Sequence, residues 1–211
     1  MKEKIRIASG QGFWGDWLEA PVHQVTKGPV DYLVMDYLAE VTMSILQKQK
    51  KKDPNLGYAR DFVNLMERIL PIIVEKNIKV ITNGGGVNPI ACRDVIFKVA
   101  QKLGIRGLKI GVVFGDDILD KIDDFIKMGV DFKNMDTGEP IEKIRDRITS
   151  ANVYFGAFPV ANFIYKLFCD TLNGYKSTCV FMLRYDDLPV RISLGDWKTN
   201  MSHIRDGAPI I

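Results

Sequence analysis

Short apolar runs alternate with longer amphipathic segments along the first three quarters of the chain. Residues 5–8, 32–35, 79–82 and 109–114 are the predicted strands. In the segments between them, apolar residues recur every three or four positions, as they do on the buried face of a helix. Strands that alternate with helices favour a parallel sheet. The predicted fold class is therefore α/β, with a mostly parallel sheet flanked by helices in a Rossmann-like three-layer architecture.

The same pattern places the helices. One is predicted to follow Asp36, and others cover residues 58–69, 89–103 and 117–127. Pro71 should end or kink the second of these, because proline lacks the N–H that an inner helix position needs. A last helix is predicted to begin at Pro140, with three isoleucines facing the core: Ile141, Ile144 and Ile148. Residues 129–138 between these helices read as a loop with a short extended piece.

The last quarter of the chain is the hardest to read. Beyond about residue 157 the alternation weakens, although residues 178–184 resemble a strand and residues 190–194 alternate as an edge strand would. The predicted division is an α/β domain over residues 1–160 and a divergent C-terminal segment over residues 161–211. Periodicity gives neither the order of the strands nor the relation of this segment to the domain.

Composition narrows the class of protein. A chain of 211 residues that is 46% hydrophobic and 26% charged can bury a substantial core. Because it has no signal-like leader and no apolar run of roughly 18 residues, we expect a cytoplasmic protein without a membrane partner. Lysines cluster at positions 48–52, but the net charge is only +3, so nucleic acid is not an expected partner. Three scattered cysteines and two histidines argue against a disulfide framework or a zinc site.

The predicted strand over residues 79–82 runs directly into a glycine-rich loop and a helix. Adjacent glycines let a backbone approach a ligand closely, and asparagine followed by proline is typical of a helix start. Free N–H groups at a helix N-terminus favour phosphate or carboxylate. A tight turn is the alternative interpretation of the glycines. The residues predicted to bind an anion here are Asn83, Gly84, Gly85, Gly86 and Asn88.

Polar residues also follow the other predicted strands, and parallel strands bring such residues to one edge of the sheet. Gly10, Gln11 and Gly12 follow the first strand and are predicted to contact the ligand. Asp36, Glu40 and Asp116 are the predicted catalytic residues, for acid-base work or for holding a divalent cation. If the helix begins by Asp36, then Asp36 and Glu40 share a helix face. Helix capping is the alternative role for Asp36 and Asp116.

Three further features of the sequence each allow two interpretations, one functional and one structural. Gly10, Gly12 and Gly15 fit a dinucleotide fingerprint superficially, with Asp36 at the spacing of a ribose partner, but bulky residues occupy the turn. Trp14 and Trp17 could stack on a ligand or cover the edge of the sheet. Cys92 lies in the first turn of a predicted helix, where a thiolate is favoured, although a buried small side chain is the simpler interpretation.

Several longer strings occur together in one order. They are residues 10–16 (GQGFWGD), 31–43 (DYLVMDYLAEVTM), 82–89 (TNGGGVNP), 115–117 (GDD) and 152–159 (NVYFGAFP). Together they resemble the N-terminal domain of the acyclic terpene utilisation family over about residues 4–160. After residue 159 the chain departs from the family pattern, which continues within a considerably longer protein, so it resembles a shortened or divergent member.

The resemblance implies a role in the breakdown of branched acyclic terpenoids, whose intermediates travel as coenzyme A thioesters. It implies a small-molecule substrate with coenzyme A as part of it, and no catalytic residues carry over. The leading hypothesis is a protein that binds an anionic ligand at the carboxyl edge of the strands and, as an enzyme, acts on an acyl-CoA as a hydrolase or lyase. The alternative is a non-catalytic assembly or accessory subunit of an acyl-CoA carboxylase system. A homo-oligomer or an acyl-CoA enzyme is the protein partner that these hypotheses allow.

Overall fold

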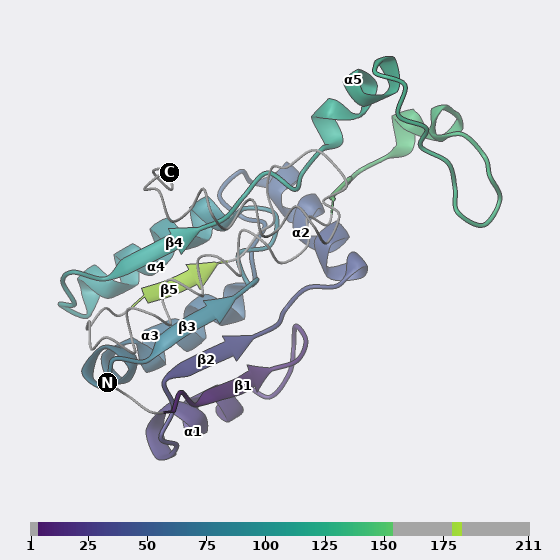
Figure 1. Ribbon diagram of the computed structural model, residues 1–211. Helices are drawn as coiled ribbons and strands as arrows, with labels where there is room; N and C mark the ends of the chain where they lie inside the picture. The colour runs from purple at the N-terminus through teal and green to yellow at the C-terminus, as the bar shows by residue number, and fades with distance from the viewer. Residues whose placement is uncertain (1–3, 154–178, 183–211) are drawn as a thin grey trace, which may run out of the picture.

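A computed structural model describes residues 4–153 and 179–182 of the chain (Figure 1). Its strands are β1 (Ile7–Gln11), β2 (Tyr32–Met35), β3 (Lys79–Thr82), β4 (Lys109–Val112) and β5 (Cys179–Met182). Its α-helices are α1 (Glu19–Lys27), α2 (Glu40–Lys52), α3 (Arg60–Glu75), α4 (Pro89–Lys102) and α5 (Ile122–Lys127). Three short 3-10 helices are η1 (Leu119–Lys121), η2 (Ile141–Lys143) and η3 (Arg145–Arg147).

The five strands form one parallel sheet in the order β1-β2-β3-β5-β4. This confirms the predicted α/β class and parallel sheet. Strand β5 comes from the segment after residue 161 and lies between β3 and β4 (Figure 1), a position that periodicity did not give. Consequently, all residues that follow the strands in sequence meet at one edge of the sheet, which we call the carboxyl edge.

Strands β2 and β3 have the predicted bounds, and β4 is two residues shorter than predicted. Strand β1 is displaced: it begins at Ile7 and ends at Gln11, rather than spanning residues 5–8. A register shift between Ser9 and Gln11 pairs Gln11 with Met35, and such a bulge extends a strand by a residue that alternation does not count. Gly10 and Gln11 therefore belong to the strand and not to the loop after it.

Helices α1, α3 and α4 pack side by side and against the sheet. The core between them is apolar, and α3 contributes the largest part of it: Phe62, Val63, Leu65, Met66, Ile69, Leu70 and Ile73. Helix α3 does not end at Pro71 but runs on to Glu75. Pro71 is exposed, so water can satisfy the carbonyl that its missing N–H leaves unpaired, while the buried residues around it keep the helix on the core.

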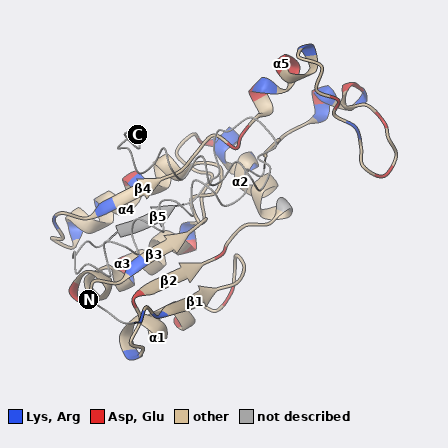
Figure 2. Ribbon diagram, viewed as in Figure 1, with Lys and Arg blue, Asp and Glu red and all other residues tan. Residues whose placement is uncertain are grey.

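Residues 117–151 project away from the sheet at its carboxyl edge (Figure 1). The helix predicted from Pro140 is wrong: the structure has only η2 and η3 there, and Ile144 is exposed. The three isoleucines have no sheet surface to cover, so amphipathic spacing alone does not stabilise a long helix. Figure 2 shows acidic and basic residues interspersed along this segment, as on a solvated surface. The predicted loop at 129–138 is present, with a single bridge between Lys133 and Pro140.

The described helices are all too short or too polar to cross a lipid bilayer. The edge strand predicted at residues 190–194 lies outside the described residues.

Candidate functional site

The ends of β2 and β3 are joined at the carboxyl edge by the side chain of Asn83. Its Nδ2 donates to Asp36 Oδ1 at 2.6 Å, and its Oδ1 accepts the backbone N–H of Tyr37 at 2.7 Å. The same Asp36 oxygen accepts the N–H of Leu38 at 3.1 Å. The carboxylate of Asp36 is exposed to solvent. Asp36 and Asn83 thus form a fixed polar pair whose acidic group remains accessible.

Helix α2 begins at Glu40, so the expectation that Asp36 and Glu40 share a helix face is wrong. Asp36 lies in the connection before the helix and does not cap it. Instead, the hydroxyl of Thr42 accepts the N–H of Ala39 at 2.6 Å and donates to its carbonyl at 2.7 Å. The helix start is therefore fixed by Thr42 at the third helical position. Because the N-cap is Ala39, this start lacks the Ser/Thr and Glu/Gln pair by which a capping box is recognised in a sequence.

The loop after β1 folds around an acidic side chain. The N–H of Gly12 donates to Asp16 Oδ2 at 3.0 Å, and the N–H of Trp17 donates to Asp16 Oδ1 at 2.7 Å. These two hydrogen bonds, first that of Gly12, lower the pKa of Asp16. A carboxylate of the chain itself therefore accepts N–H groups of the kind that the first strand-to-helix turn of a dinucleotide fold offers to a pyrophosphate. Gly10 lies inside β1, where a Cβ would stand 2.9 Å from Pro21 Cβ.

The glycine-rich loop is buried, and most of its N–H groups donate within the protein. Gly84 donates to Thr82 Oγ1, Gly86 to the carbonyl of Asn83, and Val87 to that of Gly57. Gly84 also packs on Phe62, from which a Cβ would be 3.1 Å away. The loop thus has a structural role, and anion binding by Asn83, Gly84, Gly85 and Gly86 stays a prediction.

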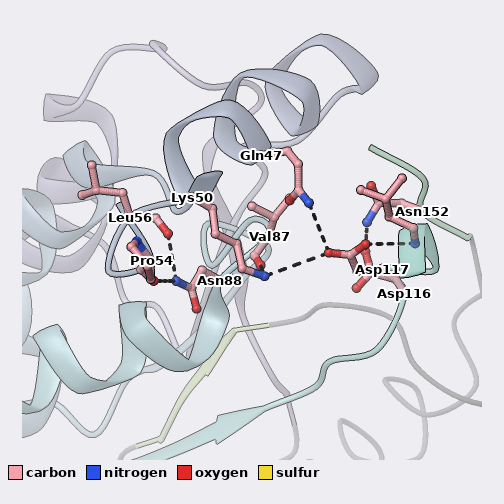
Figure 3. A network of polar contacts seen from close by, with 10 residues as sticks. Gln47, Lys50, Pro54, Leu56, Val87, Asn88, Asp116, Asp117 and Asn152 are labelled. Carbon is pink, nitrogen blue, oxygen red and sulfur yellow. Dashed lines mark hydrogen bonds and ion pairs between the residues drawn. The ribbon is translucent and has the colours of Figure 1, made fainter. Parts of the chain in front are cut away.

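Asn88 and Pro89 occupy the N-cap and first position of α4, as predicted, but Asn88 does not cap the helix. Its Nδ2 donates to the carbonyls of Pro54 and Leu56 at 2.7 and 2.8 Å. Beside it, Lys50 Nζ donates to the carbonyl of Val87 at 3.0 Å (Figure 3). The first turn of α4 consequently keeps uncapped N–H groups next to a lysine, which is the electrostatic arrangement that favours an anion.

Asp116 follows β4 and is buried. Its carboxylate accepts Asn152 Nδ2 at 2.9 Å, and its carbonyl accepts the N–H of Val153 at 2.9 Å. Asp117 Oδ2 accepts a hydrogen bond from Gln47 Nε2 at 3.5 Å and lies 4.0 Å from Lys50 Nζ (Figure 3). These two contacts connect α2 to the projecting segment. The connection around Asp116 is thus fixed by hydrogen bonds to residues 152 and 153.

Two of the predicted catalytic residues, Asp36 and Asp116, lie too far apart to belong to one cluster. Asp36 follows β2 and Asp116 follows β4, and three strand spacings, roughly 14 Å, separate the ends of those strands. Among the described side chains, no three acidic, histidine or cysteine residues are close enough to hold a metal ion. The side chain of Glu40 is outside the described residues. A catalytic role for each acidic residue stays a prediction.

The loop after β1 makes a polar contact with α3 that the sequence did not suggest. Trp14 Nε1 donates to Asp61 Oδ1 at 3.0 Å, which joins the loop after β1 to the start of α3. Burial raises the pKa of Asp61, and this effect outweighs the hydrogen bonds that lower it. Trp14 packs against the core, in line with the interpretation that it covers the sheet, whereas Trp17 is 60% exposed. Trp14 and Asp61 are 47 positions apart in the sequence, so no local pattern reveals the pair.

Tyr37 and Cys92 lie deeper in the same region. The ring of Tyr37 packs edge-on against Phe62 with 5.7 Å between centroids, and burial, followed by the nearby Asp61 and Cys92, raises its pKa. Burial likewise raises the pKa of the Cys92 thiol. Cys92 is fully buried, so the interpretation of a small core side chain is confirmed over that of a reactive thiolate.

The comparison with protein families agrees with the motifs. The model of the acyclic terpene utilisation family protein AtuA matches residues 5–165, about three quarters of the chain. No curated protein and no solved structure matches the chain. The matched range contains β1 to β4 and every residue of the carboxyl edge described above. The chain therefore belongs to the acyclic terpene utilisation family.

Proposed function

We propose that this protein binds an anionic organic ligand at the carboxyl edge of its sheet, and that the ligand is a coenzyme A thioester of a branched acyclic acid. Membership of the family supports a role in acyclic terpene utilisation. The carboxyl edge is where parallel α/β sheets bind ligands. An acyl-CoA offers phosphates for a cationic subsite and a thioester for a reactive one, and this edge contains a basic part and an acidic part.

The basic part carries the proposal. Asn88 turns its side chain away from the first turn of α4 toward Pro54 and Leu56, and Lys50 lies against Val87, directly before that turn. A phosphate there would gain both the N–H groups of the helix and the lysine charge. The predicted anion-binding residues Asn83 to Asn88 are the connection that holds this helix end in place.

Asp36 is the acidic part and the candidate for acid-base work. Its carboxylate is exposed, and Asn83 fixes one of its oxygens while leaving the group accessible. A positioned carboxylate can remove a proton next to a thioester carbonyl or activate water, which suits a lyase or a hydrolase. In an accessory subunit of an acyl-CoA carboxylase system, the same carboxylate would have no such task.

Titration with coenzyme A and a branched acyl-CoA, followed by calorimetry and thermal unfolding, tests the binding. A ligand at 100 times its dissociation constant stabilises a protein by about 2.7 kcal/mol. Lys50→Met should weaken acyl-CoA binding several-fold, whereas Lys51→Met, which removes an exposed neighbouring lysine, should not. Equal affinity in both variants, or no stabilisation of the wild type by either compound, would contradict the proposal.

Asp36→Asn separates the enzyme from the accessory subunit. If the protein is an enzyme, this variant loses turnover of the acyl-CoA and keeps its affinity for the ligand, because the amide preserves the shape of the side chain. If the protein is an accessory subunit, Asp36→Asn leaves the activity of the carboxylase complex unchanged.

A further inference from the structure

The projecting segment of residues 117–151 buries very few of its own side chains. The structure describes the whole segment, and within it only Ile118 and Ile122, both at its beginning, are buried. Large apolar side chains along the rest of it are exposed to solvent: Met128, Val130, Met135 and Ile144. Exposed apolar side chains gathered on one element mark an interaction surface. The segment therefore presents a surface that another surface can cover.

The charges of the projecting segment leave an acidic excess, because its acidic residues outnumber its basic ones. Most of its bases are paired with acids of the segment itself: Lys127 with Asp124, Lys133 with Asp131, Lys143 with Glu139, and Arg145 with Asp123. Glu142 and Asp146 are exposed and make no ion pair within the described residues. They lie on either side of the exposed Ile144 in the sequence. A surface that complements this part of the segment has to be apolar and basic.

Helix α2 has a surface of that kind. Four exposed residues recur at helical spacing along one of its faces, and we call them the α2 stripe: Val41, Ile45, Lys48 and Lys52. The apolar pair comes first and the lysines follow. Between residues 41 and 52 the helix has no acidic residue, and neither lysine of the stripe makes an ion pair within the described part of the chain. The α2 stripe is therefore apolar and basic, as the projecting segment requires.

The segment does not cover the stripe of its own chain. Its base is held by another face of α2, where Ser44 Oγ lies 3.5 Å from Ser150 Oγ and Gln47 Nε2 donates to Asp117 Oδ2. From this base the segment extends away from α2 (Figure 1). The acidic and the basic surface thus lie at the same end of one protein without meeting. Two copies related by a two-fold axis can bring the acidic surface of each onto the basic surface of the other.

We infer that two copies of this chain form a symmetric dimer in which the projecting segment of each packs on the α2 stripe of the other. Glu142 and Asp146 then lie near the two lysines of the stripe, and the exposed apolar side chains of the segment cover Val41 and Ile45. A standard interface takes about 20–30 residues from each partner, and the projecting segment together with α2 is long enough to supply them. The inference does not depend on the proposed ligand or on Asp36.

A charge exchange in the full chain tests this interface by analytical ultracentrifugation at micromolar concentrations. The first variant is Lys48→Glu/Lys52→Glu and the second is Glu142→Lys/Asp146→Lys. Each variant alone places like charges opposite one another at both contacts of the symmetric dimer. An equal mixture of the two restores opposite charges at both contacts. The control is Lys27→Glu/Lys98→Glu, which reverses two exposed lysines on α1 and α4 and so changes the net charge as the first variant does.

The wild type should sediment as a dimer, and added salt should weaken the dimer because it screens exposed charges. Each of the two interface variants should self-associate roughly tenfold more weakly than the control or worse. Their mixture should recover the affinity of the wild type. All four altered side chains are exposed, so the variants should keep the thermal stability of the fold. A monomeric wild type, interface variants that associate as tightly as the control, or a mixture without recovery would each overturn the inference.

Discussion

Asn83 Nδ2 donates to Asp36 Oδ1 across the carboxyl edge, with 2.6 Å between the two atoms. The other end of the same amide receives the backbone N–H of Tyr37. One side chain after β3 therefore fixes both the carboxylate and the backbone after β2, although the residues are 47 and 46 positions apart. A ligand that contacts Asp36 therefore encounters a carboxylate whose orientation is set by its hydrogen bond from Asn83.

Replacing Asn83 with alanine should destabilise the protein by about 1 to 2 kcal/mol. The change removes the acceptor of the Tyr37 N–H in a partly buried place, and an unsatisfied buried donor costs more than the net value of its hydrogen bond. Asn55→Ala is the control, because the Asn55 side chain is exposed and its amide donates to the nearby Asp53. Urea unfolding gives both values. Equal stability of the two variants would mean that the Asn83 link does not constrain the edge.

Gly86→Ala should destabilise the protein by more than about 2 kcal/mol. Gly86 has φ of +53°, and a Cβ there would lie 2.7 Å from the carbonyl oxygen of Gly57 and overlap Leu46 Cδ1. Strained backbone and overpacking add in one substitution. Gly107→Ala isolates the first effect, since Gly107 has φ of +74° and nothing near its missing Cβ.

Chemical denaturation of the two glycine variants measures the difference. Gly107→Ala should cost only about 1 kcal/mol, the strain of a left-handed backbone. If Gly86→Ala lowers the free energy of unfolding by no more than Gly107→Ala does, then the loop after β3 can shift to accommodate a Cβ, and close packing does not require glycine at position 86.

The sequence predicted the central strands well because of their burial. All four residues of β3 are buried, and three of the four in β2 are, so the apolar residues of each strand are adjacent instead of alternating with polar ones: Val80 and Ile81 in β3, and residues 32–35 in β2. The start of α4 was also predictable, since Pro89 is preorganised for the first helical position. Alternation failed in β1, where the bulge at Gln11 adds a residue out of phase, and at Ile141 to Ile148, where helical spacing has no surface to cover.

The location of the candidate site could be predicted from the sequence, but most of its side-chain contacts could not. Parallel strands had to bring Asp36, Asn83 and Asp116 to one edge, and they do. Which of them touch depends on strand order, and the insertion of β5 between β3 and β4 moves Asp116 away from Asp36. The pairing of Trp14 with Asp61 depends on how the loop after β1 meets α3, and no local pattern encodes such a contact.

Cys92 should resist alkylation in the native protein. Its side chain is fully buried and burial raises its pKa, so both access and thiolate formation are suppressed. Labelling with iodoacetamide, read by mass spectrometry of the peptide that contains Cys92, should be slower in buffer than in urea by roughly a hundredfold or more. Fast labelling in the native state would revive the interpretation of Cys92 as a reactive thiol at the start of α4.

Asp61 should make the protein relatively more stable as the pH falls. Burial raises its pKa in the folded state above the ordinary value of 3.8, so folding binds a proton. Stability that depends on this proton grows as the pH drops through the folded pKa and is fully present below 3.8. Asp61→Asn cannot bind the proton, yet its amide oxygen can still accept the Trp14 N–H. Lowering the pH from 7 should therefore raise the stability of the wild type relative to Asp61→Asn.

Asp16→Asn gives a control of opposite sign. The hydrogen bonds from Gly12 and Trp17 lower the pKa of Asp16, so its contribution is present above 3.8 and is lost as the pH falls through the folded pKa. Acidification should therefore lower the stability of the wild type relative to Asp16→Asn, while it raises it relative to Asp61→Asn. Urea unfolding at several pH values measures both differences. Since each variant removes one carboxyl group from the same protein, curves of the same sign would show that burial does not govern Asp61, and the link from Trp14 to α3 would then be a solvated one.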